Sequence, residues 1–129
     1  MKTIIAGSRD IYDARIIISA IMESGFDITE VVSGTCHGVD RVGEHYAKLK
    51  GIPIKRMPAE WSDVKVKGAI IKINKYNHKY NVAAGPQRNA KMAEYADALI
   101  AIWDGKSKGT QGMIRLAQDK GLKVFIKEV

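Results

Sequence analysis

Residues 3–25 read TIIAGSRDIYDARIIISAIMESG, and this stretch decides the fold. Thr3 to Ala6 is a short, β-branched apolar run that is typical of a buried strand, and it ends at Gly7. In the segment from Asp13 to Ser24, isoleucine and alanine recur on one helical face, and Gly25 can supply the left-handed residue that ends a helix. The stretch therefore predicts a strand, a glycine loop and a helix.

The same order of elements continues along the chain. Further strands are expected at 28–32, 52–57, 98–103 and 122–126, and further helices carry Val39 to Leu49, Pro86 to Ala96 and Met113 to Ala117. Residues 59–84 give mixed signals and receive no assignment. Strands that alternate with helices and are apolar along nearly their full length favour a parallel sheet. We expect an α/β, Rossmann-like fold with a mostly parallel sheet of about five strands and helices on both faces.

Length and composition limit the class of protein. The 129 residues, 46% hydrophobic and 27% charged, predict a single globular domain over 1–129, with a basic insertion at about 64–84. No stretch approaches the roughly 20 apolar residues of a membrane span, and residues 1–6 are too short for a secretory signal. One cysteine and three histidines are too few for an internal disulfide or a structural zinc site. We expect a cytoplasmic protein with no membrane partner, no metal and no cofactor.

The positive charge is concentrated in one segment. The chain carries 21 Lys and Arg against 14 Asp and Glu, a formal net charge of +7, which favours an anionic partner. Residues 64–93 contain no acid but seven bases, which are Lys65, Lys67, Lys72, Lys75, Lys79, Arg88 and Lys91. The interleaving of Lys72, Lys75 and Lys79 with tyrosines is compatible with nucleic-acid binding. A solvated flap is the favoured interpretation, because basic surface alone is unspecific.

Four glycine-bearing loops point to a ligand. The loops at 7–10, 33–40 and 104–110 follow strands, so in a parallel sheet they meet at one edge, and a fourth at 85–89 opens a helix. Helix N-termini and hydroxyl groups favour phosphate. The polar residues of these loops are Ser8, Arg9, Ser33, Thr35, Arg88, Asn89, Ser107 and Thr110. Ordinary turn and cap chemistry also explains each single loop, and Asp40 is compatible with a helix cap or with a ribose contact.

Aromatic residues are candidates for stacking on a base. Trp61, Trp103, Tyr76 and Tyr80 are available, and Trp103 has the best position because it ends a strand directly before a loop. The same residues are also compatible with closing a core. Gly34 and Gly38 have the spacing GxxxG and not the dinucleotide pattern GxGxxG, and Gly105-Lys106-Ser107 lacks the earlier glycine of a Walker A loop. Conventional NAD and ATPase sites are therefore not expected.

Several motifs together resemble a known family. They are GSRD at 7–10, VVSGTCHGVD at 31–40, a Pro-Ala-x-Trp element at 58–61, AGPQRN at 84–89 and ADALIAIWDGKSKGT at 96–110. In this order they resemble the YspA/YpsA-related branch of the SLOG superfamily, over nearly the whole chain. That superfamily also contains the LOG-type nucleotide phosphoribohydrolases and the DprA-like DNA-processing proteins.

The resemblance implies a Rossmann-like fold that binds nucleotides or nucleotide-derived molecules, and relatives commonly form homo-oligomers. Carried over by position, it adds Gly7, Gly34, Gly38 and Gly109 to the ligand-binding candidates and matches Arg88-Asn89 and the S-x-G-T element at 107–110. LOG-type hydrolases carry a glutamate after this element, in the pattern PGGxGTxxE, whereas Met113 stands at that position here. The segment between Trp61 and Gly85 is also longer than in that branch.

Three functions compete at this stage. The first is binding of a nucleotide or nucleotide derivative, as a sensor or sequestering protein, with phosphate on the loops at 7–9 and 107–110. The second is hydrolysis of a nucleotide, for which the acid or base would come from Asp10, Asp40, Glu60 or Asp63, with Asp40 and Glu60 as the main catalytic candidates. The third is nucleic-acid binding through the basic insertion. The sequence leaves the base, the number of phosphates and the oligomeric state open.

Overall fold

The computed structural model describes all residues from Met1 to Val129, and they form seven strands and four helices. The strands are β1 (Lys2–Gly7), β2 (Glu30–Ser33), β3 (Ile54–Arg56), β4 (Ile71–Ile73), β5 (Lys79–Asn81), β6 (Ala98–Trp103) and β7 (Lys123–Glu128). The helices are α1 (Ala14–Ser24), α2 (Val39–Lys50), α3 (Ala84–Tyr95) and α4 (Lys108–Asp119). No helix combines the length and apolar character that a bilayer span requires.

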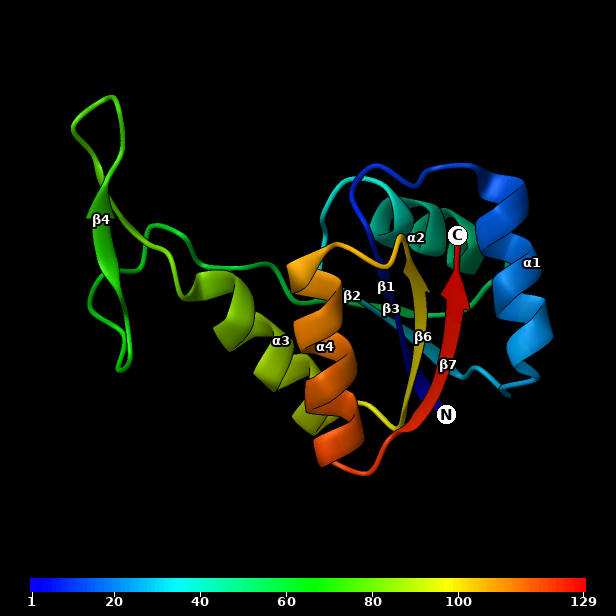
Figure 1. Ribbon diagram of the computed structural model, residues 1–129. Helices are drawn as coiled ribbons and strands as arrows, with labels where there is room; N and C mark the ends of the chain where they lie inside the picture. The colour runs from blue at the N-terminus through cyan, green and yellow to red at the C-terminus, as the bar shows by residue number, and fades with distance from the viewer.

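Five of the strands form one parallel sheet in the order β3-β2-β1-β6-β7 (Figure 1). β1 is the central strand, with Thr3 opposite Val31 of β2 on one side and opposite Ala98 of β6 on the other. The predicted α/β, Rossmann-like fold with about five strands is therefore confirmed. The division of the chain into one domain with an insertion stays a prediction.

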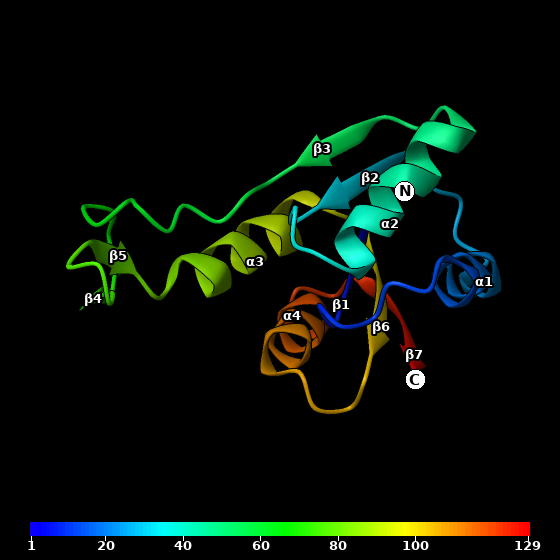
Figure 2. The same ribbon diagram turned by 90° about the horizontal axis from the view of Figure 1, so that it is seen from above.

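Alternating residues of the central strands build a core on each face of the sheet. Ile4 packs against α3 and α4 on one face, whereas Ile5 packs against α1 and α2 on the other. Leu99 and Ile100 divide in the same way on β6. Figure 2 shows α1 and α2 on one side of the sheet and α3 and α4 on the opposite side. The helix pairs thus leave no face of the central strands exposed, which explains why these strands are apolar throughout.

Several details differ from the sequence prediction, among them two element boundaries and the inner face of α2. β3 begins only at Ile54, after Pro53, which has no N–H to donate to the sheet. The predicted loop at 104–110 ends earlier, because α4 begins at Lys108. Leu49 is 68% exposed and does not belong to the inner face of α2. That face consists of Val39, Gly43 and Ala47, and Leu49 lies two residues, or about 200°, beyond it.

Residues 59–83 form a projection that the sequence prediction left unassigned. Its two short strands, β4 and β5, make an antiparallel hairpin that stands away from the main sheet in both Figure 1 and Figure 2. The buried Asn81 attaches its base to α3, because its Oδ1 accepts from Ile70 and Ala83 N–H at 3.1 and 2.9 Å and its Nδ2 donates to Gln87 at 2.9 Å. Polar contacts of Asn81 and Gln87 therefore join the projection to α3, since Gln87 Nε2 also donates to Lys67 O at 3.1 Å.

Two helical glycines give a matched test of the packing. A Cβ on Gly43 of α2 would lie 2.9 Å from Ile5 Cγ2, whereas a Cβ on Gly112 of α4 would meet nothing within 4 Å. We expect Gly43→Ala to lower the free energy of unfolding by about 1–3 kcal/mol because of overpacking. Gly112→Ala should raise it by up to about 1 kcal/mol through helix propensity. Urea unfolding measures both, and equal shifts in the two variants would contradict this packing.

Candidate functional site

The loops after β1 and β6 diverge at the centre of the sheet. The chain turns from β1 toward α1 on one face, and from β6 toward α4 on the other, so a crevice opens at the carboxyl ends of these neighbouring strands. Ser8 closes the bottom of the crevice, since its N–H donates to Ile102 O at 3.1 Å and its Oγ accepts from Asp104 N–H at 3.2 Å. Open α/β sheets bind ligands at this type of switch point.

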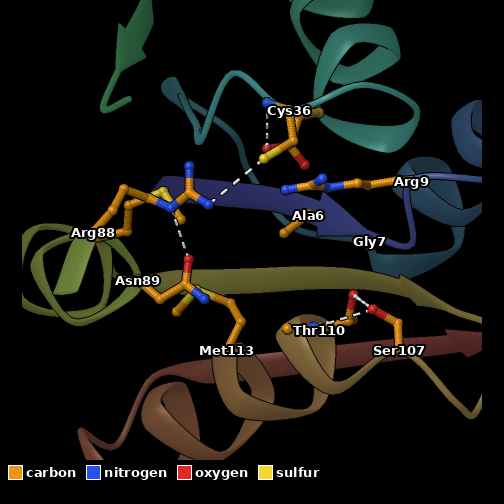
Figure 3. Close-up of a pocket in the computed structure, with 12 residues that line it drawn as sticks. Ala6, Gly7, Arg9, Cys36, Arg88, Asn89, Ser107, Thr110 and Met113 are labelled. Carbon is orange, nitrogen blue, oxygen red and sulfur yellow. Dashed lines mark hydrogen bonds between the residues drawn. The ribbon is translucent and has the colours of Figure 1, made fainter. Parts of the chain in front are cut away.

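A hollow of about 100 Å³ lies in this crevice and is called the central hollow below (Figure 3). The predicted site residues that line it are Gly7, Arg9, Asp40, Arg88, Asn89, Ser107, Gly109 and Thr110. They come from the loops after β1, β2 and β6 and from α3, which are distant in the sequence. The expected gathering of loops at one edge of the sheet is therefore present.

The first turn of α4 forms one wall of the hollow. Ser107 caps the helix through a hydrogen bond of 3.5 Å from Thr110 N–H to its Oγ, and the N–H of Gln111 donates to Ser107 O. The N–H groups of Lys108 and Gly109 have no intrahelical acceptor. Asp104 stabilises the turn before the cap. Its carboxylate accepts hydrogen bonds from the backbone N–H groups of Ser107 and Lys106, and these bonds lower its pKa. This wall offers backbone donors and two hydroxyl groups to an anion.

Two arginines lie at the opposite wall, and only one of them is free. Arg88 donates Nε to Asn89 Oδ1 at 2.8 Å, Nη1 to Gly34 O and Nη2 to Cys36 Sγ at 3.6 Å. Arg9 is exposed, has no hydrogen-bond partner within the protein and extends across the hollow (Figure 3). Arg88 therefore contributes positive potential and holds the loop after β2, whereas Arg9 is available for a ligand.

Asp40 is buried in the first turn of α2 and borders the hollow. Only 5% of its surface is exposed, and its Oδ2 accepts from Cys36 N–H at 3.2 Å. Burial raises the pKa of its carboxyl group to about 6, against the lowering effects of the Cys36 hydrogen bond and of Arg88. Asp40 does not cap α2, because the N-cap residue is Gly38 and the Cys36 N–H lies in the loop before the helix, so the cap interpretation is wrong. A contact of Asp40 with ribose stays a prediction.

The other predicted residues of the loop after β2 hold the loop in place and do not line the central hollow. Ser33 Oγ donates to Glu44 at 2.7 Å and accepts from Thr35 N–H, and Thr35 adopts a left-handed backbone with φ 64°. Gly34 has no room for a side chain, because a Cβ would lie 2.6 Å from Arg88 Nη1. A Cβ on Gly38 would lie 2.5 Å from Arg9 O. Without side chains, Gly34 can lie against Arg88 and Gly38 can lie against the backbone of Arg9. The close neighbours of both glycines are therefore protein atoms.

Like Ser8, Ser33, Gly34, Thr35 and Gly38, the predicted residues Trp103 and Glu60 lie outside the lining of the central hollow. Trp103 packs against the core under α3 and α4, and its Nε1 donates to Ser107 O at 3.0 Å, so it positions the cap of α4. Glu60 lines a separate hollow of about 270 Å³ beside Asp63 and Lys91. Of the four candidate catalytic carboxylates, Asp40 alone reaches the central hollow.

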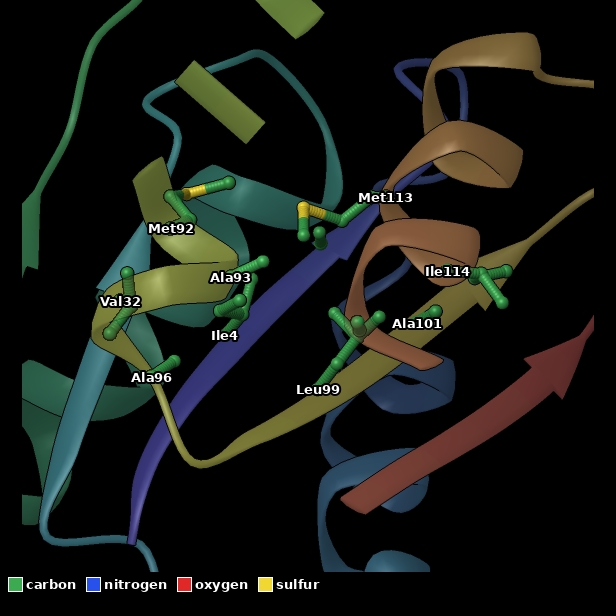
Figure 4. Packing of buried hydrophobic residues seen from close by; sticks show 11 residues of the cluster. Ile4, Val32, Met92, Ala93, Ala96, Leu99, Ala101, Met113 and Ile114 are labelled. Carbon is green, nitrogen blue, oxygen red and sulfur yellow. The ribbon is translucent and has the colours of Figure 1, made fainter. Parts of the chain in front are cut away.

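Sequence reasoning missed the floor of the hollow. Met92 of α3 and Met113 of α4 are both buried and line the hollow on its core side. Figure 4 shows them among the buried residues that pack on this face of the sheet. Met113 thus occupies, as an apolar floor residue, the position where the resembled hydrolases carry glutamate. Cys36 lines the hollow as well. Its place in the loop between Gly34 and Gly38 was the only sequence signal for it.

Two larger hollows adjoin the central one. The first lies between α3 and α4, has a volume of about 240 Å³ and shares Arg9, Arg88, Asn89 and Gly109 with the central hollow. The second, of about 270 Å³, lies beside Pro58 and shares Arg9, Cys36 and Arg88 with it. Trp61 borders both. We call them the α3–α4 hollow and the Pro58 hollow.

Comparison with known proteins shows where this fold recurs. No protein-family profile and no curated sequence matches the chain. Among solved structures, the X-ray structure of DNA processing protein A (DprA) from Streptococcus pneumoniae matches with a TM-score of 0.69 and 21% sequence identity. The fold is shared with DprA. The match covers 97% of this chain and 49% of that chain, so the present chain spans about half the length of the solved one.

The buried carboxyl group of Asp40 predicts a pH effect on stability. Its folded pKa of about 6 exceeds the ordinary 3.8, so the folded state binds the proton more tightly, and stability falls as pH rises from about 4 to about 6. Asp40→Asn removes this ionisation. We expect the variant to gain up to about 3 kcal/mol relative to wild type between pH 4 and pH 7, measured by urea unfolding. A difference between the two proteins that does not change with pH would exclude the raised pKa.

Proposed function

We propose that this chain binds a nucleotide or a nucleotide-derived molecule, with a phosphate group in the central hollow. The observation that carries the proposal is the convergence of the α4 N-terminus, with its free N–H groups, and the unpaired guanidinium of Arg9 on one small hollow at the switch point of the sheet. A hollow of about 100 Å³ suits a phosphate group better than a whole nucleotide, since ordinary ligand pockets measure roughly 300–1,000 Å³.

Each wall has a distinct part in holding the phosphate. The N–H groups of Lys108 and Gly109 donate to phosphate oxygens, as at other helix N-termini. The hydroxyl groups of Ser107 and Thr110 lie 3.2 Å apart and share one hydrogen bond, so one of the two remains to donate to the phosphate. Arg9 adds a fork of charge-assisted hydrogen bonds from the open side. Asn89 has a free Nδ2 donor, because only its Oδ1 is used by Arg88, so Asn89 and Asp40 are available to ribose hydroxyls.

The chemistry of the hollow favours binding over hydrolysis. Asp40 is its only carboxylate, and Met113 stands where LOG-type enzymes would place a second acidic group. The name of DprA, a DNA-processing protein of the same fold, agrees with a nucleotide-related ligand. Together with the order of motifs, these features support placement in the YspA/YpsA-related branch of the SLOG superfamily. A homo-oligomer in the cytoplasm is part of the same proposal.

Removal of the Arg9 guanidinium tests the phosphate site. We expect nucleoside monophosphates to stabilise the wild-type protein, by about 2.7 kcal/mol at 100 times the dissociation constant. Arg9→Gln should weaken their binding about 10- to 100-fold, because a hydrogen bond to a charged group contributes about 1.5–3 kcal/mol. The control is Arg115→Gln, which replaces an exposed arginine of α4 that lies outside the hollow and should leave binding unchanged. Thermal shift measures both, and a wild type that no phosphate compound stabilises would refute the proposal.

As a second candidate function, we propose that the hairpin binds nucleic acid. Asn74 Oδ1 accepts from Tyr76 N–H at 2.9 Å and from His78 N–H at 3.0 Å, and Asn77 takes the left-handed conformation that the turn needs. Tyr76 is 68% exposed on this ordered tip, with Lys75 Nζ 5.1 Å from its ring centre. An aromatic face beside lysines is the arrangement that binds single strands.

Salt dependence separates this role from a solvated flap. If Lys72, Lys75 and Lys79 contact phosphates, neutralising all three to glutamine should reduce the slope of log affinity against log salt by about 2, measured with a single-stranded oligonucleotide by fluorescence anisotropy. The control is neutralisation of Lys48, Lys50 and Lys123, three exposed lysines outside the hairpin, which should leave the slope unchanged. Equal slopes in the two triple variants would remove the hairpin from nucleic-acid binding.

A further inference from the structure

Trp61 is a large aromatic side chain held at the rim of the site with much of its surface free. It is 43% exposed, although an indole ring of this size normally contributes to a core. The ring lies against the first turn of α3, where a Cβ on Gly85 would approach Trp61 Cη2 to 3.3 Å. The backbone O of Trp61 accepts from Asn81 N–H at 2.7 Å, which fixes the residue to the base of the hairpin. The ring is thus positioned by the protein without being covered by it.

The α3–α4 hollow beside this ring is shaped by missing side chains. Gly109 and Gly112 of α4 face open space, since a Cβ on either would meet nothing within 4 Å, and Gly85 lies on the α3 side. Pro86 and Leu116 add apolar surface. The hollow is therefore a smooth slot between two helix starts, with an aromatic ring as one boundary, and it suits a flat, partly apolar group.

The slot is continuous with the proposed phosphate site. Arg9, Arg88, Asn89 and Gly109 line both the central hollow and the α3–α4 hollow. A ligand whose phosphate lies in the central hollow can therefore extend past Arg9 into the slot without crossing a packed region. The volumes of about 100 and about 240 Å³ fit a ligand with a small part in the central hollow and a larger part in the slot.

We propose that the α3–α4 hollow with Trp61 is the base subsite of this protein, so that its ligand is a nucleoside monophosphate type of molecule and not a sugar phosphate alone. This inference rests on the proposed function. The exposed indole face of Trp61 stacks on the base, while the glycines of α3 and α4 leave room for the ring. Trp103 does not take this part, because its indole is packed in the core and its Nε1 is bonded to Ser107 O.

A calorimetric titration with probes of increasing size tests the subsite. The probes are inorganic phosphate, ribose 5-phosphate and the four nucleoside monophosphates AMP, GMP, CMP and UMP. We expect at least one nucleoside monophosphate to bind about 10- to 100-fold more tightly than ribose 5-phosphate, as stacking on one aromatic side chain provides. Trp61→Ala should remove this difference and leave ribose 5-phosphate binding unchanged, whereas Trp61→Phe should retain most of it.

A second variant guards against a local loss of structure around Trp61. Gly112→Leu fills the α3–α4 hollow from a helical position where a Cβ has no clash, and it should lower nucleoside monophosphate binding to the level of ribose 5-phosphate. If Trp61→Ala weakens binding but Gly112→Leu does not, the base lies in the Pro58 hollow and the assignment is wrong. If ribose 5-phosphate binds as tightly as every nucleoside monophosphate, the base subsite is refuted while the phosphate site stands. If no probe binds, both proposals fail.

Discussion

The parallel pairing of β1 with β6 is the constraint on which the site depends. Gly7 lies opposite Ile102 in this register, and a Cβ on Gly7 would be 2.2 Å from Ile102 O, so the two strand ends are in direct contact. Ser8 continues this contact beyond the strand ends, because its N–H donates to Ile102 O and its Oγ accepts from Asp104 N–H. Because the following helices lie on opposite faces of the sheet, the chains must separate immediately after this point. The central hollow is the space that this separation creates.

The remaining walls are held in place by a polar connection between α2, α3 and the loop after β2. Arg88 reaches from α3 to Gly34 O, and Asp40 reaches from α2 to Cys36 N–H, so the same short loop is held from both sides. Ser33 and Glu44 fix its start. A buried carboxylate is costly unless it is paired, and the raised pKa of Asp40 is the measure of that cost. The loop is thus held by side-chain hydrogen bonds, and Arg9 is the exposed, unpaired donor of the site.

Much of this arrangement could be predicted from the sequence. Apolar strands followed by glycine loops imply a parallel sheet, and a parallel sheet brings the predicted loops at 7–10 and 104–110 to one edge. The presence of Arg9, Ser107 and Thr110 in one hollow followed directly. Contacts that depend on the relative position of two helices did not follow. Met92 and Met113 could be recognised as core residues, but not as the floor of a hollow. The two tryptophans show the same limit, because only coordinates reveal that Trp103 Nε1 reaches Ser107 O while the ring of Trp61 stays free.

The hairpin escaped prediction for a different reason. Its isoleucines are exposed, so residues 59–84 lack the alternation of buried and exposed residues from which a strand is predicted. Hydrogen bonds of polar residues fix its shape instead, with Asn74 at the tip and Asn81 at the base. Attachment through Asn81 also explains how a two-stranded sheet, which is marginal in isolation, is maintained here. The same residue places Trp61 beside α3, and so joins the hairpin to the site.

A crystal structure of the protein grown with a nucleoside monophosphate tests the central claim most directly. The account predicts a phosphate whose oxygens lie about 2.7–3.2 Å from Gly109 N and from the hydroxyl group of Ser107 or Thr110, with Arg9 closed over it. A phosphate bound only on the hairpin, or anywhere away from the first turn of α4, would contradict it.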